Sequence, residues 1–237
     1  MFDIHSHILP NIDDGAENIQ EALDLLKLLK EDGVTKVLAT PHFYPQDTNL
    51  EEYLKLSKKI FQAVKKVTEN KELPEIFLGC ELLYYDSIGM SEAVSNLCLN
   101  NSKYLLLELT DNCINNKLYE NILSLKTEIG ITPIIAHIER YYRAKEYKKF
   151  LKFISENNIP VQINATSFFM PMFKRPLKRL LNCDIFIVLG SDTHSVDARP
   201  PKISEALKFI EKKYGLEIKE KIIRNSNLLC SKITDSE

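Results

Sequence analysis

Five histidines stand where they could bind a metal ion, because each lies at or just after the end of a short apolar run. His5 and His7 follow the first run, and since strand side chains alternate between two faces, both should point the same way. His42 ends "ATPH", His137 ends "IIAH" and His194 ends "GSDTH". In parallel α/β folds the carboxyl ends of the strands meet on one face, so the sequence predicts that all five imidazoles converge.

Four acidic residues share this placement. Glu81 follows the third apolar run, Glu108 ends the fourth, and Asp192 lies in the last motif. In the loop "NIDDG" we expect Asp14 to reach the site and Asp13 to belong to the loop alone. Carboxylates and imidazoles buried together would repel one another and lose hydration without a compensating charge, so the pattern favours a metal site.

The donor types narrow the metal and the reaction. Nitrogen and oxygen donors without cysteine thiolate suit Mn²⁺, Fe²⁺, Co²⁺ or Zn²⁺, and nine donors are too many for one ion, so we expect two or three divalent ions. Closely spaced divalent ions suit hydrolysis of a phosphate monoester, because a bridging hydroxide can attack phosphorus while the ions neutralise the phosphoryl oxygens. The predicted metal ligands are His5, His7, Asp14, His42, Glu81, Glu108, His137, Asp192 and His194.

Two arginines near these motifs could hold the phosphate. Arg140 follows the fifth-strand histidine by three residues, and Arg199 follows the last histidine by five. The guanidinium fork matches phosphate oxygens, although a surface salt bridge is the alternative for either residue. We expect no phosphoenzyme, and a phenolate leaving group with a pKa of about 10 makes a general acid dispensable. If an acid acts, His42 and Asp192 are the candidates.

Composition argues against several other functions. The formal net charge of -2, with no basic, aromatic-interleaved stretch, speaks against a nucleic-acid partner. The five cysteines form no C-x-x-C pair and none has an arginine six positions later, which excludes a cysteine-based phosphatase loop and disfavours a disulfide framework. No apolar run approaches the roughly 20 residues of a membrane helix, so we expect no membrane insertion and a cytoplasmic protein.

Seven apolar runs should position these residues. They are apolar throughout, as in strands buried on both faces, and amphipathic helical stretches separate them, which favours a parallel (β/α)7 barrel. We expect a single domain over residues 1–237, with the barrel over about 1–215 and a C-terminal helix and frayed tail over 216–237. Residues 167–183 should form a loop followed by a short helix. The runs lie at residues 2–4, 36–40, 75–79, 104–109, 132–137, 160–166 and 184–190, and the helical stretches include 19–33, 50–70, 118–130 and 145–158.

The longer motifs resemble a known family. "DIHSHILPNIDDGA", "GVTKVLATPHFYP", "AHIERY" and "LGSDTHSVDARPP" are similar to the PHP (polymerase and histidinol phosphatase) superfamily, and within it to the bacterial manganese-dependent protein-tyrosine phosphatases of capsular and exopolysaccharide loci. The resemblance implies a distorted TIM-like barrel, the PHP fold, with Mn²⁺ bound by the nine residues above and phosphate contacted by Arg140 and Arg199. It also implies a phosphotyrosine substrate in the C-terminal tail of a cognate bacterial tyrosine kinase. Residues 167–176 depart from the family pattern.

Two alternative functions follow from the same residues. One is another phosphoesterase on this scaffold, such as a histidinol-phosphate or other small-molecule phosphatase, or a nuclease-type enzyme. The other is a non-catalytic module that keeps the metals for stability and binds the kinase tail. Comparing turnover on phosphotyrosyl peptide, histidinol phosphate and a phosphodiester separates these functions.

Overall fold

The computed structural model describes residues 1–110 and 112–235, and all its strand pairs are parallel. One sheet has the strand order β1-β2-β4 and the other β3-β5-β6-β7-β8-β9. Parallel pairing with helical crossovers is the architecture that the apolar runs predict. The strands are β1 (Phe2–Asp3), β2 (Lys36–Ala39), β3 (His42–Phe43), β4 (Glu75–Leu78), β5 (Glu81–Leu83), β6 (Tyr104–Glu108), β7 (Thr132–Ile135), β8 (Val161–Asn164) and β9 (Ile187–Gly190).

Two strands, β3 and β5, lie just beyond the second and third predicted runs, and through them the chain passes from one sheet to the other, which joins the two sheets into one barrel. β2 leads into β3 through Thr40 and Pro41, and β4 leads into β5 through Gly79 and Cys80. Proline has no N–H to give to a strand ladder, which separates β2 from β3. A Cβ atom on residue 79 would lie 2.6 Å from a methyl carbon of Leu99, so any larger residue at the second break would have to displace that side chain.

The last run closes the barrel against the first. The backbone N–H of Asp192 donates to the carbonyl of His5 at 2.8 Å, and the N–H of His7 donates to the carbonyl of Thr193 at 2.9 Å. The seven predicted runs therefore follow one another around a single barrel in chain order, and the predicted fold class is confirmed. The two breaks and the short β1 make this barrel distorted.

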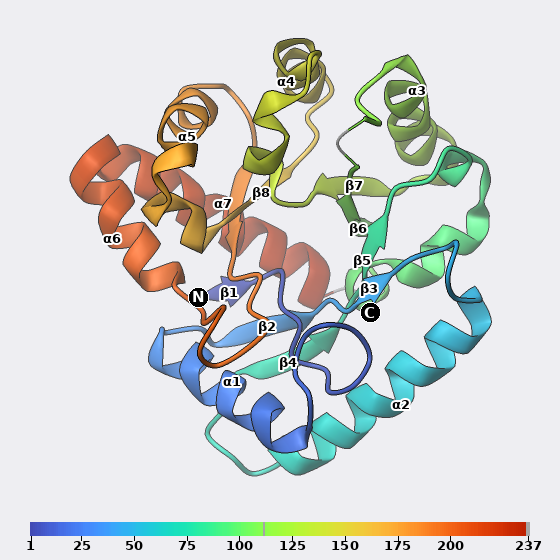
Figure 1. The fold of residues 1–237 in the computed structure, drawn as a ribbon, viewed down its shortest axis with the longest axis vertical. Helices are drawn as coiled ribbons and strands as arrows, with labels where there is room; N and C mark the ends of the chain where they lie inside the picture. Colours follow the sequence, from blue (N-terminus) through green and yellow to red (C-terminus); the bar gives the residue numbers. More distant parts are fainter. Residues whose placement is uncertain (111, 236–237) are drawn as a thin grey trace.

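Helices surround the strands (Figure 1), and a helix overlaps each of the four predicted helical stretches. The stretch at 118–130 differs in detail, because its last five residues form a π-helical turn (Leu125–Ile129) before Gly130, whose φ of 80° ends the helix. The unit between β5 and β6 carries three short 3-10 helices in place of an α-helix. The helices are α1 (Ile19–Glu31), α2 (Leu50–Thr68), α3 (Asn116–Ser124), α4 (Tyr147–Glu156), α5 (Lys174–Leu181), α6 (Ile203–Tyr214) and α7 (Leu216–Thr234).

The C-terminal helix α7 closes one end of the barrel. Leu229 and Ile233 of this helix are buried with Leu38, Leu106 and Val188, which come from β2, β6 and β9. The strand residues next to these pack outward against the surrounding helices. This helix begins at Leu216, within the range expected for a C-terminal helix and tail, and the end of that range, residues 236–237, lies outside the described residues.

The irregular segment after β8 is more ordered than predicted. Instead of a loop, two 3-10 helices (Ala165–Phe169 and Pro171–Phe173) lead into α5. Ser167 Oγ donates to the buried carboxylate of Glu139 at 2.7 Å, which holds the first of these helices against the segment after β7. Along the described chain, no helix combines the length and the apolarity needed to cross a membrane.

Candidate metal centre

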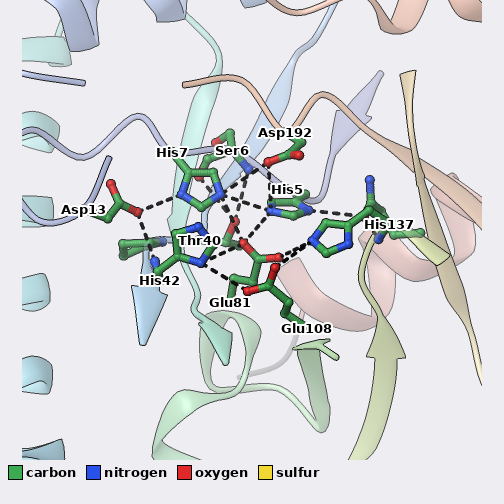
Figure 2. Close-up of polar contacts among 12 residues, drawn as sticks. His5, Ser6, His7, Asp13, Thr40, His42, Glu81, Glu108, His137 and Asp192 are labelled. Atoms are coloured by element: carbon green, nitrogen blue, oxygen red, sulfur yellow. Dashed lines mark hydrogen bonds and ion pairs between the residues drawn. The ribbon is translucent and has the colours of Figure 1, made fainter. Parts of the chain in front are cut away.

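The carboxylate of Glu81 lies at the middle of the histidine cluster (Figure 2). Its Oε2 atom is 3.0 Å from His5 Nε2, 3.2 Å from His7 Nε2 and 3.1 Å from His42 Nδ1. Its Oε1 atom is 2.9 Å from His137 Nε2. Because the carboxyl ends of the parallel strands meet here, one fully buried carboxylate contacts four histidines that are far apart in the sequence.

Three groups of side chains offer candidate ligand atoms in the described part of the chain. Within each group the ligand atoms lie no more than 4.8 Å apart. Adjacent groups share residues, so ions bound by them would be neighbours. The groups are His5, His7 and Glu81; His42, Glu81 and Glu108; and His7, Asp14, His42 and His194.

The two remaining predicted ligands touch the same cluster. His137 Nε2 lies 3.5 Å from Glu108 Oε1. Asp192 Oδ1 lies 3.4 Å from His5 Nε2 and 3.6 Å from His194 Nδ1. All nine residues selected from the sequence are therefore brought together at one end of the barrel.

Asp14 is the outermost member of the cluster. Its Oδ1 lies 3.3 Å from His194 Nε2 and 3.7 Å from His42 Nε2, and its side chain is 69% exposed. Solvent therefore reaches the centre from this side.

The chemistry of the donor set fits divalent cations. His42 Nδ1 and His194 Nε2 are buried nitrogens without a hydrogen-bond partner among the described residues, although both face carboxylates. Burial and the adjacent Glu81 raise the pKa of Glu108 to about 7. Burial and the nearby His7 lower the pKa of His194 to about 4, which keeps its imidazole neutral. A cation would give the orphaned nitrogens a partner and compensate the crowded carboxylates.

In two histidines the ring nitrogen that faces away from the cluster has a partner of its own. His7 Nδ1 lies 2.7 Å from Asp13 Oδ2, and His137 Nδ1 lies 3.1 Å from the Tyr141 hydroxyl. Metal-binding histidines in proteins show this pattern, in which the outer contact fixes the tautomer and turns the free lone pair inward.

The prediction that Asp13 belongs to the loop alone is incomplete. Its Oδ1 accepts from the Gly15 N–H at 3.0 Å, as expected of a loop residue, but its Oδ2 also accepts from the His42 backbone N–H at 3.0 Å and contacts His7. Burial would raise the pKa of Asp13, but its hydrogen bond with His7 outweighs burial and lowers the pKa to about 2. The loop brings Asp13 this close because Gly15 packs on the His7 carbonyl, where a Cβ atom would lie at 2.2 Å.

Two amide side chains of β8 belong to the site and were missed in the sequence. Gln162 Oε1 accepts from the His137 backbone N–H at 2.7 Å and lies 3.2 Å from His5 Nδ1. Gln162 Nε2 donates to Asn164 Oδ1 at 2.7 Å, and Asn164 Nδ2 donates to Asp192 Oδ2. The signal was present in "PVQINAT", where two polar residues stand two positions apart in a buried run and so share a face.

Two predicted ligands adopt left-handed backbone conformations. His137 has φ 32° and Asp192 has φ 52°, a region in which residues other than glycine are uncommon. The Gln162 side chain holds the N–H of His137, and the His5 carbonyl holds the N–H of Asp192. Such strain of about 1–3 kcal/mol per residue persists where surrounding contacts enforce it, and it is common at functional sites.

Both predicted phosphate-binding arginines converge on Asp192. One terminal nitrogen of Arg140 and one of Arg199 each lie 2.6 Å from Asp192 Oδ2. The two side chains are 40% and 39% exposed, so they stand at the rim with their charged ends directed inward. They therefore pair with a predicted metal ligand and not with a surface acid.

The fold and the site define a parallel α/β-barrel protein with a candidate multinuclear metal centre at the carboxyl ends of its strands. The model of the family described as capsular polysaccharide synthesis, CpsB/CapC, matches residues 1–230. This chain belongs to that family.

Relatives and a solved structure match nearly the whole chain. The tyrosine-protein phosphatase CpsB of Streptococcus pneumoniae is 30% identical over 230 residues, which cover 91% of this chain and 91% of the relative. The tyrosine-protein phosphatase YwqE of Bacillus subtilis is 28% identical, over 97% of this chain and 91% of the relative. A crystallographic study of these two proteins, described there as unique metal-dependent tyrosine phosphatases, provides a structure with TM-score 0.86 and 26% identity, covering 98% of this chain and 95% of that one.

Proposed function

We propose that this protein is a metal-dependent protein-tyrosine phosphatase that hydrolyses phosphotyrosine. The observation that carries the proposal is the convergence of nine nitrogen and oxygen donor residues beside two arginines. The relatives named as tyrosine-protein phosphatases, and the similarity of the fold to metal-dependent tyrosine phosphatases, support it.

Two or three divalent ions are the cofactor in this proposal, with Mn²⁺ favoured and Fe²⁺, Co²⁺ or Zn²⁺ as the other candidates. The ligands would be His5, His7, Asp14, His42, Glu81, Glu108, His137, Asp192 and His194. Bound ions of this kind lower the pKa of water and neutralise charge on phosphoryl oxygens. The outer contacts from Asp13, Gln162 and Tyr141 keep the imidazole lone pairs directed inward.

The arginines supply the phosphate clamp. Arg140 and Arg199 approach one oxygen of Asp192 from two sides, so the carboxylate orients both guanidinium groups before substrate arrives. Each guanidinium keeps further N–H groups for non-bridging phosphate oxygens. Preorganised positive charge of this kind favours a transition state in which charge spreads over those oxygens.

In this proposal Asp192 orients the two arginines and does not act as a general acid. Burial would raise the pKa of this carboxyl, but its contacts with His5, His7 and Arg140 outweigh burial and lower the pKa, so Asp192 carries no proton to donate. The other candidate named from the sequence is weakened in the same way, because burial lowers the pKa of His42. Phenolate is a tolerable leaving group because its conjugate acid has a pKa of about 10, so the reaction does not depend on this histidine as an acid.

The substrate in this proposal is a phosphotyrosine-containing protein, namely the C-terminal tail of a bacterial tyrosine kinase that regulates capsule or exopolysaccharide synthesis. The description of the family as capsular polysaccharide synthesis supports this assignment. Because the kinase tail in this proposal lies inside the cell, the proposed location of the enzyme is the cytoplasm.

The test is metal analysis of protein purified without chelator, together with turnover on phosphotyrosyl and phosphoseryl peptides, histidinol phosphate and a phosphodiester. Metal-dependent hydrolysis that prefers phosphotyrosine supports the proposal. Preference for histidinol phosphate would instead identify a small-molecule phosphatase, and no hydrolysis of any substrate with each of the four metals would leave a non-catalytic binding module. A single turnover in ¹⁸O-water should label the released phosphate, whereas a trapped phosphorylated side chain would contradict direct attack by water.

A further inference from the structure

A cavity of about 500 Å³ opens directly beside the candidate metal centre. Its walls come from the loop after β1, from β3 and the residues that follow, and from the first two turns of α2. Asp14 and His42 belong both to the cavity and to the metal cluster, so the two spaces are continuous. A volume of this size accommodates a side chain with part of its neighbouring residue.

One part of the cavity wall is apolar and aromatic. Ile12, Tyr44 and Leu56 line it. The Tyr44 ring stacks on the His42 ring, with centroids 5.0 Å apart and planes inclined by 22°. Leu56 is 46% exposed although it is a large apolar residue, so its side chain is available to a ligand. These walls provide contact area to an aromatic ring that approaches the centre.

Another part of the cavity wall is acidic. Asp13, Asp14 and Glu52 line it, and among the described residues neither a lysine nor an arginine does. Positive charge lies elsewhere, since both rim arginines contact Asp192. Figure 2 shows Asp13 and His42 together on one side of the cluster and Asp192 at another edge, beside His5. The site is thus divided into a cationic side that suits the phosphate and an anionic, aromatic side that suits an uncharged or basic group.

We propose that this cavity is the subsite for the aromatic ring and the adjacent residue of the substrate, and that it selects phosphotyrosine flanked by a basic or neutral residue over phosphotyrosine flanked by an acidic one. The inference rests on the proposed function, since it concerns the substrate of the same site. An acidic flanking residue would face the exposed carboxylate of Glu52, and like charges repel. A basic flanking residue would be attracted by the same carboxylate.

The charge of Glu52 tests the selectivity, and Glu51 provides a matched control. Both glutamates lie in the first turn of α2, so replacing either removes the same favourable interaction with the helix N-terminus, but only Glu52 lines the cavity. The metal-loaded wild type should show a kcat/KM at least about fivefold higher for a phosphotyrosyl peptide with flanking lysine than for one with flanking glutamate at low salt. Glu52→Lys should abolish or reverse this ratio, whereas Glu51→Lys should keep it.

Leu56 tests the apolar wall. Leu56→Gln should raise KM for both peptides about fivefold with kcat unchanged, because part of a leucine contact is worth about 1 kcal/mol. Val67→Gln is the control, since Val67 is an exposed apolar residue of the same helix that does not line the cavity.

The outcomes separate this inference from the proposed function. If the wild type hydrolyses both peptides equally well and the Glu52 and Leu56 variants behave like their controls, the subsite is wrong while the phosphatase assignment stands. If the metal-loaded wild type hydrolyses no phosphotyrosyl substrate at all, the proposed function fails and the subsite assignment fails with it.

Discussion

The two ends of the barrel interior have opposite compositions. At the end closed by α7, Leu38, Leu106 and Val188 pack with Leu229 and Ile233, and all five are at most 1% exposed. At the other end the same barrel presents a cluster of buried imidazoles, carboxylates and amides. Parallel strands permit this division because all of them end on the same side of the barrel. Each strand can therefore carry apolar residues at one end and polar residues at the other.

β8 shows the contrast within one strand. Val161 and Ile163 pack outward in the core beneath the helices, while Gln162 and Asn164 join the polar cluster. β6 shows it along one face, since Leu106 belongs to the apolar end and Glu108, two residues later, to the cluster. Burial of apolar side chains stabilises the fold, whereas buried polar groups cost free energy unless they are paired. The apolar end of the barrel therefore contributes to the stability of the fold, whereas the polar end lowers stability and provides the candidate metal ligands.

The largest expected effect is a loss of phosphatase turnover when a residue at the polar end of the barrel is replaced. Glu81→Gln should lower phosphatase turnover by about 10³-fold, about 4 kcal/mol, because the central carboxylate that contacts four histidines is lost. Bound metal, measured by elemental analysis, should fall as well. Glu139→Gln is the matched control: this glutamate is also buried but lies outside the cluster, and burial raises its pKa to about 7, so a neutral replacement should be tolerated. Normal metal content in Glu81→Gln would contradict the central role of this residue.

The next largest expected effect is a loss of stability, without a loss of turnover, when a residue at the apolar end of the barrel is replaced. Leu229→Ala should lower the free energy of unfolding by about 2–5 kcal/mol, because it leaves a cavity beneath α7. The measurement is denaturant unfolding of metal-depleted protein. Leu228→Ala should cost far less, since this neighbour is 48% exposed. Turnover of folded Leu229→Ala should equal that of the wild type, and a large loss of turnover would show that the two ends are not independent.

A smaller effect, on metal affinity, is expected when a polar residue of the cluster is replaced by an apolar one. Gln162→Leu removes the acceptor for His5 Nδ1 and the His137 N–H, and loss of such an outer partner weakens metal affinity by about 10–100-fold. Competition with a chromophoric chelator measures this change. The free energy of unfolding of the metal-depleted protein should fall by about 1–3 kcal/mol, because the buried His137 N–H loses its acceptor. Gln20→Leu, at an exposed position of α1, is the control, and equal metal affinity in the two variants would remove Gln162 from the site.

The smallest expected effect is at the rim. Arg199→Ala should lower turnover at least about tenfold, about 1.4 kcal/mol, with metal content unchanged, because this side chain contacts Asp192 and not the histidines in the structure. Arg143→Ala, an exposed arginine that bonds to Tyr142, should have no effect. An unchanged rate in Arg199→Ala would exclude this residue from phosphate binding.

The sequence by itself determined the barrel and the nine candidate ligands. Apolar runs alternating with amphipathic stretches are local patterns, and they specify buried parallel strands with helical crossovers. Since such strands end on one face, the type of the residue at each strand end was enough to predict that His5, Glu81, His137 and Asp192 would meet.

Only the tertiary structure decided how these residues are held. The contact between Asp13 and His7 depends on a loop that folds back onto the His7 carbonyl, and the relay from Gln162 through Asn164 to Asp192 depends on the register of neighbouring strands. The pairing of both arginines with one carboxylate oxygen, and the cavity beneath α2, also join segments that are distant in the sequence. Periodicity reports which face a side chain occupies, but its partner across the barrel is set by three-dimensional packing, so these contacts had no local signal.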